Sequence, residues 1–223
     1  MATTTKNTTK KSKGSLAEDL KEKYKEYILT NGHEPTSVFL FAKEMGIKEE
    51  VFYQYYGSFN AIQSAIWADL IEQTISAVRG DKIYLEYSAR EKLLAFYYTL
   101  MERLKRDRSY VKYTIDTKIK KPEITPAFLQ DFRRRFVSFV EELLQEGLEK
   151  GEIAQRPIIT NRYKDGLWLQ LAFVINFWLK DDSANFEKTD AAIEKSVNLA
   201  FEFMADGPIE RVIDFAKFLY QNK

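Results

Sequence analysis

Apolar residues recur at intervals of three and four along almost the whole chain. This spacing places side chains on one face of an α-helix, whereas no segment alternates apolar and polar residues as a half-buried strand would. Glycine or a Gly-Pro pair separates most of the stripes, as expected at helix ends. The stripes cover residues 16–28, 38–45, 51–55, 62–78, 93–104, 110–119, 125–150, 167–179, 193–204 and 209–219. The pattern predicts an all-α fold of about nine to ten helices.

Local signals divide the predicted helices into two groups. Ser58 precedes the long fourth stripe and is expected to be its N-cap. Thr125-Pro126 predicts another helix start, with the threonine as cap and the proline in the first turn, where its missing N–H costs nothing. Because short helices precede Ser58 and longer ones follow, we expect a three-helix head over residues 15–57. A helical body follows over residues 58–223, and the fourth helix joins the two without a linker.

Composition excludes several classes of protein. The 223 residues are 45% apolar, which is enough to bury a sizeable core. The chain has no cysteine, so disulfides and thiolate metal ligands are impossible; we expect no metal, no cofactor and a reducing, cytoplasmic location. The N-terminal segment lacks the apolar stretch of a signal peptide. The longest apolar run, residues 167–179, falls short of the ~20 residues of a membrane span, so no membrane partner is expected.

Charge is distributed unevenly within the first sixty residues. The net charge of the whole chain is only +1, which does not by itself indicate nucleic acid. Residues 1–14 contain Lys6, Lys10, Lys11 and Lys13 and no acidic residue, while residues 15–60 contain five lysines and eight acidic residues. We therefore expect residues 1–14 to be a disordered basic tail in front of an acidic head. Such a tail either solubilises the terminus or reaches along DNA.

The second and third predicted helices are joined by Lys43-Glu44-Met45-Gly46-Ile47-Lys48. Two short helices joined by a glycine-containing turn form the helix-turn-helix pattern. Glycine suits the turn because the chain reverses there through a conformation with positive φ. Ile47 is expected to fill the angle between the helices, and the second helix then presents its N-terminal side chains to a major groove.

The stretch from Thr36 to Ser58 resembles the DNA-binding head of the TetR (tetracycline repressor) family. The family pattern is Thr, Ser or Thr and a hydrophobe, then hydrophobe-Ala, then Gly-Val/Ile, then Leu/Phe-Tyr-x-His/Tyr-Phe/Tyr before a long fourth helix. The chain matches this pattern in order and spacing at Thr36, Ala42, Gly46, Ile47, Phe52, Tyr53 and Tyr56. The resemblance implies a one-component transcription regulator, in most cases a repressor, that binds double-stranded operator DNA as a homodimer. It also implies that a hydrophobic small molecule bound in the body releases the DNA.

The same resemblance assigns roles in DNA binding by position. In the family, the Thr/Ser pair at the start of the second helix contacts a phosphate, and the tyrosine of the third helix reaches the backbone. The neighbouring positions of the third helix face base edges, where Lys and Gln can read sequence. The residues expected to contact DNA are Thr36, Ser37, Lys48, Glu49, Glu50, Tyr53, Gln54 and Tyr55, with Lys10, Lys11 and Lys13 of the tail.

Two departures from the family pattern support an alternative. Glu49 and Glu50 stand where many members have a small or basic residue, and Phe59 stands where many have a phosphate-binding lysine. Carboxylates are repelled by phosphates, although glutamate can accept a hydrogen bond from cytosine N4. Each missing cation lowers both DNA affinity and its salt dependence. The alternative function is a dimeric ligand-binding or protein-interaction module whose helix-turn-helix no longer binds DNA.

Aromatic residues make up 14% of the chain, and many lie in the predicted body. Most are expected to pack in the core, but an apolar pocket with a few polar groups is the usual composition of a small-molecule site. The run Arg133-Arg134-Arg135 is expected to form a solvated helix face, with an anion site as the alternative. The predicted ligand-binding residues are Tyr97, Tyr113, Phe136, Trp168, Gln170, Phe173 and Asn176.

The helix predicted over residues 167–179 is apolar on all sides and must be buried all round. One face can pack on the core while another contacts a second subunit, and with the ninth helix it resembles the family's dimer interface. The predicted interface residues are Phe177, Trp178, Ile193, Val197, Phe201 and Met204. An enzyme is not expected, because the chain has one histidine, no phosphate-binding glycine loop and no glycine-flanked serine nucleophile.

Overall fold

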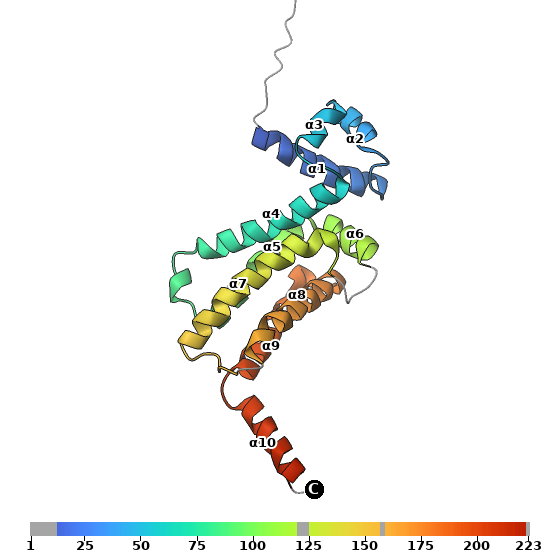
Figure 1. Ribbon diagram of the computed structural model, residues 1–223. Helices are drawn as coiled ribbons and strands as arrows, with labels where there is room; N and C mark the ends of the chain where they lie inside the picture. The colour runs from blue at the N-terminus through green and yellow to red at the C-terminus, as the bar shows by residue number, and fades with distance from the viewer. Residues whose placement is uncertain (1–12, 120–124, 157–158, 222–223) are drawn as a thin grey trace, which may run out of the picture. The chain divides into compact units, whose positions relative to one another are not determined.

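The computed structural model describes residues 13–119, 125–156 and 159–221 (Figure 1). Within these ranges the chain is all-α, as the sequence pattern predicts, and contains no strand. Its helices are α1 (Lys13–Asn31), α2 (Val38–Glu44), α3 (Glu49–Tyr53), α4 (Phe59–Arg79), α5 (Ala89–Arg106), α6 (Arg108–Lys118), α7 (Gln130–Glu149), α8 (Tyr163–Lys180), α9 (Glu187–Met204) and α10 (Pro208–Gln221). Four short 3-10 turns, η1 (Tyr84–Glu86), η2 (Ala127–Leu129), η3 (Thr160–Arg162) and η4 (Ala184–Phe186), lie between them.

The contacts divide the chain into two compact units, Met1–Ile66 and Trp67–Lys223. The division falls within α4, so this one continuous helix contributes residues 59–66 to the first unit and 67–79 to the second. The first unit contains the helix-turn-helix and the second contains the larger helical bundle. They are called the head and the body below.

The head is built around four aromatic rings, Tyr24, Phe41, Phe52 and Phe59. Tyr24 and Phe59 stack with centroids 5.6 Å apart, and Phe41 and Phe52 each lie 5.7 Å from Phe59. Tyr24, Phe41 and Phe52 are buried. Tyr56 donates a hydrogen bond to the carbonyl of Ala17 at 3.3 Å, which joins the end of α3 to α1. Aromatic burial therefore fixes the positions of α2 and α3, which are too short to be stable alone.

The turn between α2 and α3 has the geometry that the sequence predicts. Gly46 has φ of +70°, a conformation that side chains with a Cβ rarely adopt. The amide of Ile47 then donates to the carbonyl of Ala42 at 2.9 Å. Ser37 caps α2, because its Oγ accepts a hydrogen bond from the amide of Leu40 at 3.2 Å.

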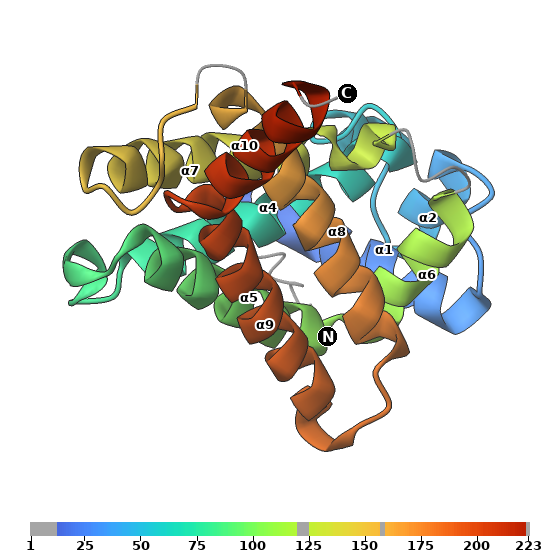
Figure 2. The ribbon, with the colours of Figure 1, turned by 90° about the horizontal axis from the view of Figure 1, so that it is seen from below.

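The body packs α5 against α7 and α9, and α8 against α7 and α9. Figure 2 shows α8 and α9 side by side. The buried faces of these helices meet in one core that includes Leu93, Phe96, Phe136, Leu171 and Ile193. The amphipathic patterns of α5, α7 and α9 therefore account for the bundle, since burial of their apolar faces drives its packing.

Polar caps and turns set the ends of the longer helices. The Oγ of Ser58 accepts from the amide of Ala61 at 3.2 Å, so Ser58 caps α4 as predicted. Ser88 and Glu91 form a reciprocal capping box at the start of α5. The predicted helix start at Thr125-Pro126 is wrong in detail. Pro126 is extended, with ψ of 151°, and precedes a 3-10 turn, so α7 begins at Gln130. The physical reason is that a residue before proline is disfavoured in helical backbone, and proline itself tolerates an extended ψ.

Buried charged groups brace the body where helices end. Arg156, which is buried, donates to the carbonyls of Met204 at 3.2 Å and Ala205 at 2.8 Å and so holds the C-terminal end of α9. Lys92 is buried on α5 and forms an ion pair with Glu146 of α7 at 2.6 Å. These partners satisfy charges that would otherwise be costly to bury.

Among the described residues, no helix combines the length and the apolar character that crossing a membrane requires.

Candidate functional site

The start of α3 carries both signs of charge. Lys48 occupies the N-cap position without forming a side-chain cap, and Glu49 and Glu50 lie in the first turn. The Lys48 ammonium lies 3.5 Å from the Glu50 carboxylate, so the cation is partly neutralised. Carboxylates are favoured in the first turn because the amides there carry partial positive charge. The acidic residues thus help α3 to form and reduce the attraction of its start for phosphate.

Tyr53 lies one turn after Glu49 on α3. Its hydroxyl donates to the Glu49 carboxylate at 3.3 Å, and its ring is half exposed. Partial desolvation raises the pKa of Tyr53, and the neighbouring Glu49 charge raises it further. The hydroxyl therefore stays protonated at neutral pH and can donate to a phosphate only by leaving Glu49.

The start of α2 offers two hydroxyl groups. Thr36 is exposed, and Ser37 is half-buried with its oxygen accepting the capping bond. The hydroxyl hydrogen of Ser37 is still available to a phosphate, because capping uses only a lone pair of the oxygen. Phe39 and Leu40, in the first turn of α2, are more than half exposed. The exposed start of α2 thus combines hydrogen-bond donors with apolar side chains.

The other residues predicted to contact DNA vary in accessibility. Gln54 is exposed at the C-terminal end of α3, and Tyr55 is half-buried. Lys10 and Lys11 lie outside the described residues, and of Lys13, the first residue of α1, only the backbone is described. The structure therefore brings together the predicted residues of α2 and α3 in the head.

Phe59 has taken a structural role at the position where many family members carry a lysine. Its ring stacks on Tyr24 and contacts Phe41 and Phe52. A lysine here could not replace these ring contacts without leaving a gap in the aromatic cluster. The head therefore gains core packing where a phosphate contact would otherwise stand.

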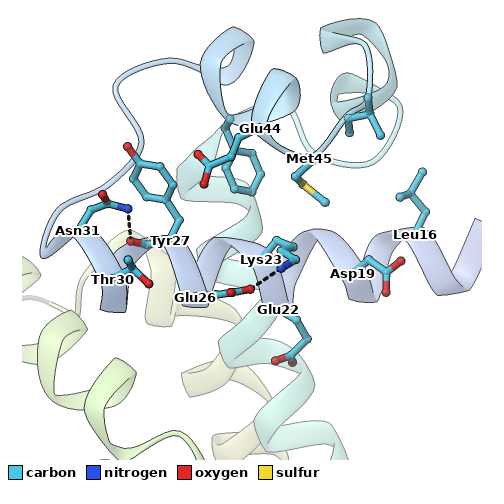
Figure 3. A pocket seen from close by; sticks show the side chains of 12 residues that line it. Leu16, Asp19, Glu22, Lys23, Glu26, Tyr27, Thr30, Asn31, Glu44 and Met45 are labelled. Carbon is cyan, nitrogen blue, oxygen red and sulfur yellow. Dashed lines mark hydrogen bonds and ion pairs between the residues drawn. The ribbon is translucent and has the colours of Figure 1, made fainter.

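A groove of about 630 Å³ lies between α1 and α2 in the head (Figure 3). Its charged lining consists of four carboxylates, Asp19, Glu22, Glu26 and Glu44, and of Lys23. Lys23 donates to Glu26 at 2.6 Å, and this hydrogen bond and the Glu26 charge raise the pKa of Lys23. This face of the head is acidic and is not suited to bind phosphates.

The body contains a separate cavity of about 710 Å³. This volume lies in the range of roughly 300–1,000 Å³ typical of small-molecule sites. Residues of α4, α6, α7 and α8 line it, among them Trp67, Ile115, Phe132, Trp168 and Ile175. The polar groups of the wall are Arg133, Asp116, Asp165, Thr125 and Asn176. An apolar wall with a few polar groups is suited to bind a hydrophobic organic molecule.

The cavity contains two of the seven predicted ligand-binding residues, Trp168 and Asn176. Tyr97 and Gln170 are instead hydrogen-bonded to each other at 3.2 Å, and burial raises the pKa of Tyr97. Phe136 is buried between Phe96 and Trp168. Tyr113 is half-buried on α6 outside the cavity lining. Phe173 is half exposed beside Phe177, because it projects from the outer face of α8.

Sequence reasoning missed the residues that close the cavity. Trp67 lies off the main apolar stripe of α4, and Arg133 was expected on a solvated face. A large aromatic residue outside the main stripe of a long helix is a signal that a second face is covered. In the part of the chain that the structure describes, no group of three potential ligands gathers to hold a metal ion.

The predicted interface residues lie on the inner faces of α8 and α9. Trp178, Ile193, Val197, Phe201 and Met204 are buried in the body core. Their role in a subunit interface stays a prediction, because packing within one subunit does not show which residues a partner would contact. Phe177 is half-buried beside Phe173. The large apolar side chains that α8 and α9 expose are Leu169, Phe173, Leu199 and Phe203.

Comparison with known proteins places this fold. A model of the family described as "Tetracyclin repressor-like, C-terminal domain" matches residues 92–219, more than half of the chain. No curated protein sequence matches the chain. Among solved structures, the fatty acid degradation regulator FadR from Bacillus halodurans is 18% identical with a TM-score of 0.64, over 86% of this chain and 97% of that one.

Two further solved structures are similar over most of both chains. A TetR family transcription regulator from Marinobacter aquaeolei VT8 is 21% identical with a TM-score of 0.55, over 87% of this chain and 97% of that one. A regulatory protein in the tetR family from Rhodococcus RHA1 is 15% identical with a TM-score of 0.56, over 87% and 98%. At these identities the likeness shows the fold, and the family model adds the membership. The chain belongs to the TetR family of transcriptional regulators.

Proposed function

We propose that this protein represses transcription as a homodimer that binds operator DNA and is released by a hydrophobic small molecule. The observation that carries the proposal is the continuity of α4. Its first residues, 59–66, belong to the head, and the next residue, Trp67, lines the cavity of the body. A ligand that moves Trp67 therefore acts directly on a helix whose first residues belong to the head.

DNA binding is proposed for the exposed start of α2 and for α3 with the residues that cap it. Thr36 and Ser37 supply hydroxyl donors to phosphates, and Lys48 and Gln54 reach base edges. Two heads in a dimer would occupy half-sites about 34–36 Å apart, or a multiple of this, in a near-palindromic operator. The tail lysines add phosphate contacts that the folded part of the head supplies sparsely.

Dimerisation is proposed for the outer faces of α8 and α9. Leu169, Phe173, Leu199 and Phe203 expose about half or more of their surface in one subunit. Apolar side chains of this size on adjacent helices are typical of a homodimer interface, which resembles a core cut in half. Isologous packing of two such pairs would form a four-helix interface.

Release by the ligand requires that the two states of the dimer bind it differently. A ligand with equal affinity for both states shifts nothing, however tightly it binds. The proposed arrangement is that the liganded cavity favours a spacing of the heads that does not match the operator. Binding of DNA and of ligand then oppose each other with one coupling free energy.

The proposal is tested by selecting bound fragments from random genomic DNA and titrating their affinity against salt. We expect enrichment of near-palindromic sites and a steep fall in affinity as salt rises, since phosphate contacts release counterions. A full-length variant with Lys6, Lys10, Lys11 and Lys13 changed to Gln measures how much of the DNA affinity the tail supplies. Absence of binding by both proteins at low salt would exclude DNA as the present target.

One specific observation favours the alternative, a dimeric ligand-binding or protein-interaction module. The head combines the acidic groove of α1 and α2, Glu49 and Glu50 on α3, and Phe59 in its core. Under this alternative the head is retained for its fold and the cavity for its ligand. Ligand binding without any salt-dependent DNA binding would support it.

A further inference from the structure

We propose that the ligand of the body cavity is an apolar organic anion, a carboxylate on an aliphatic body, held through its oxygens by Trp67 and Arg133. This inference rests on the proposed ligand-sensing role of the cavity and adds the chemical class of the ligand. It follows from which polar groups of the cavity wall already have partners and which do not.

Trp67 supplies the first unpaired group. Its side chain is 2% exposed, and its ring contacts Phe128 and Phe132 with centroids 5.9 and 5.7 Å away. Its Nε1 is buried and has no hydrogen-bond partner among the described residues. An indole N–H can only donate, so the partner that would satisfy it is an acceptor atom. Trp67 lines the cavity, but this atom is fully buried, so a ligand supplies the acceptor once neighbouring side chains have shifted.

Arg133 supplies the second group. Its guanidinium lies 5.7 Å from the ring centroid of Trp168, which also lines the cavity, and 3.5 Å from the carboxylate of Asp165. A separation of 3.5 Å is long for a charge-assisted hydrogen bond, which is usually about 2.7–2.9 Å. The guanidinium is thus positioned on an aromatic wall and is weakly held by its carboxylate. A planar anion can bind its fork of donors.

The carboxylates of the cavity wall already have cationic partners, whereas Arg133 has only one distant carboxylate among the described residues. Asp116 is paired with Lys112 at 2.9 Å and is exposed, and Asp165 lies between Arg133 and Arg162, at 3.5 and 3.7 Å. A cationic ligand would compete with these existing partners and would leave the Trp67 N–H unpaired. An anionic ligand uses both donors, so the inventory of partners favours an anion.

The remaining wall sets the body of the ligand. Leu129, Phe132, Leu171 and Ile175 are buried apolar residues, and Ile115 is half-buried. These residues offer no acceptor or donor, and the neutral polar groups of the wall are limited to Thr125, Asn176 and the indole of Trp168 in the described lining. The ligand therefore carries an anionic group at one end and aliphatic or aromatic carbon elsewhere, because unpaired polar groups on it would lose their water without compensation.

The test uses a series of n-alkyl carboxylates from octanoate to hexadecanoate, with n-alkyltrimethylammonium ions of matched chain length, all below micelle-forming concentrations. Affinity for the full-length protein is measured by isothermal titration calorimetry. We expect at least one carboxylate to bind about tenfold more tightly than its matched ammonium ion, the effect of one charge-assisted hydrogen bond. Equal or tighter binding of the ammonium ions, or no binding of any carboxylate, would overturn the assignment.

Four variants locate the binding. Arg133→Gln and Trp67→Phe are each expected to weaken carboxylate binding about tenfold. Arg134→Gln removes the same charge one residue away, from a side chain outside the cavity lining. Trp178→Phe removes another buried indole N–H that has no partner among the described residues and does not line the cavity. Both controls should bind as the wild type does; a similar loss in a control and in its matched variant would contradict a specific role.

The salt titration of DNA binding keeps this inference separate from the proposed function. If DNA binds and no carboxylate does, the ligand class is wrong and the regulator stands. If carboxylates bind with the expected dependence on Trp67 and Arg133 but no DNA binds, the ligand class stands and the regulator is wrong.

Discussion

The head and the body use their aromatic residues differently. In the head, Tyr24, Phe41, Phe52 and Phe59 contact one another and complete a small core. In the body, Trp67 and Trp168 line a cavity of about 710 Å³, and the Trp67 N–H has no partner among the described residues. The head thus uses these four rings to complete its small core, whereas the larger body has rings to spare for the wall of a cavity.

The difference also concerns charge. The head places acidic side chains along α1, α2 and the first turn of α3, and its position 59 serves packing. Both units pair their buried charges, as Lys21 does with Glu18 in the head and Lys92 with Glu146 in the body, each at 2.6 Å. The head is therefore well suited to fold and sparsely provided with phosphate contacts, while the body contains the cavity and the exposed apolar face on which the proposed ligand and dimer depend.

The largest expected effect concerns the outer face of the body. Phe173→Glu should dissociate the proposed dimer and leave the subunit folded, because this side chain is 51% exposed and is not part of the core. An interface aromatic contributes about 2 kcal/mol or more, and a two-fold axis uses it twice, so the dissociation constant should rise roughly 1,000-fold. Sedimentation equilibrium measures this change.

Leu85→Glu is the matched control for the dimer. Leu85 is 84% exposed on η1, away from α8 and α9, so its replacement should not change the oligomeric state. A Phe173→Glu protein that sediments as the wild-type protein does would show that the outer face of α8 does not contact a partner.

The next effect tests how firmly the body holds its helix ends. The carboxylate of Asp181 accepts four hydrogen bonds from the amides and hydroxyls of Ser183 and Thr189, at 2.6 to 2.9 Å. Burial alone would raise the pKa of Asp181, but these bonds outweigh burial and hold it well below its ordinary value of 3.8. Asp181→Asn should lower the melting temperature at pH 7, because an amide cannot accept from all four donors.

The pH dependence of this effect has a definite sign. Since the folded pKa lies below the unfolded one, the stabilisation is fully present above about pH 3.8 and is lost as pH falls toward the folded pKa. The difference in melting temperature between wild type and Asp181→Asn should therefore shrink below that pH. Asp182→Asn is the control, because the Asp182 side chain is exposed. It should lower the melting temperature less than Asp181→Asn does at pH 7. A difference that grows on acidification would contradict the role of the carboxylate.

The head could be predicted from sequence because its signals are local. The turn at Gly46, the cap at Ser58 and the order of aromatic residues in α3 depend on neighbours within a few positions. The all-α fold was predictable for the same reason, since helical periodicity is a local pattern. The prediction of a helix start at Thr125-Pro126 was wrong, because a capping residue and a proline also suit an extended segment before a 3-10 turn.

The sites of the body could not be predicted as well, because they depend on which face of each helix is covered. α8 is apolar on most sides, so its sequence does not distinguish buried Trp178 from exposed Phe173. Tyr97 and Gln170 look like ligand contacts in sequence but satisfy each other across α5 and α8. Trp67 and Arg133 meet in one cavity only after α4, α7 and α8 have packed.

A smaller effect tests the turn of the head. Gly46 has φ of +70° and empty space where a Cβ would stand, so Gly46→Ala should cost only backbone strain, about 1–2 kcal/mol of unfolding free energy. Gly57→Ala is the control, because Gly57 also has space for a Cβ but no positive φ. It should be neutral or stabilising by about 0.4–1 kcal/mol, through the unfolded chain. Urea denaturation measures both, and equal effects would contradict a strained turn.

The smallest effect tests whether the acidic start of α3 opposes DNA. The double variant Glu49→Gln, Glu50→Gln removes two charges from the first turn of α3 and leaves Tyr53 with a neutral acceptor in place of a carboxylate. Exposed charges interact by only about 0.2–1 kcal/mol, so affinity for nonspecific DNA should rise about two- to fivefold at low salt. Fluorescence anisotropy with a labelled duplex measures the change across a salt series.

The double variant Asp81→Asn, Glu86→Gln removes two charges from exposed positions of the body and controls for net charge. It should leave DNA affinity unchanged if the effect of Glu49 and Glu50 is local to α3. A fall in affinity for a selected operator, together with a rise for nonspecific DNA, would mean that one of these carboxylates reads a base, since glutamate can accept a hydrogen bond from cytosine N4. The acidic residues would then provide specificity in the head at the expense of affinity, and the tail lysines would have to supply the attraction to phosphate that the head lacks.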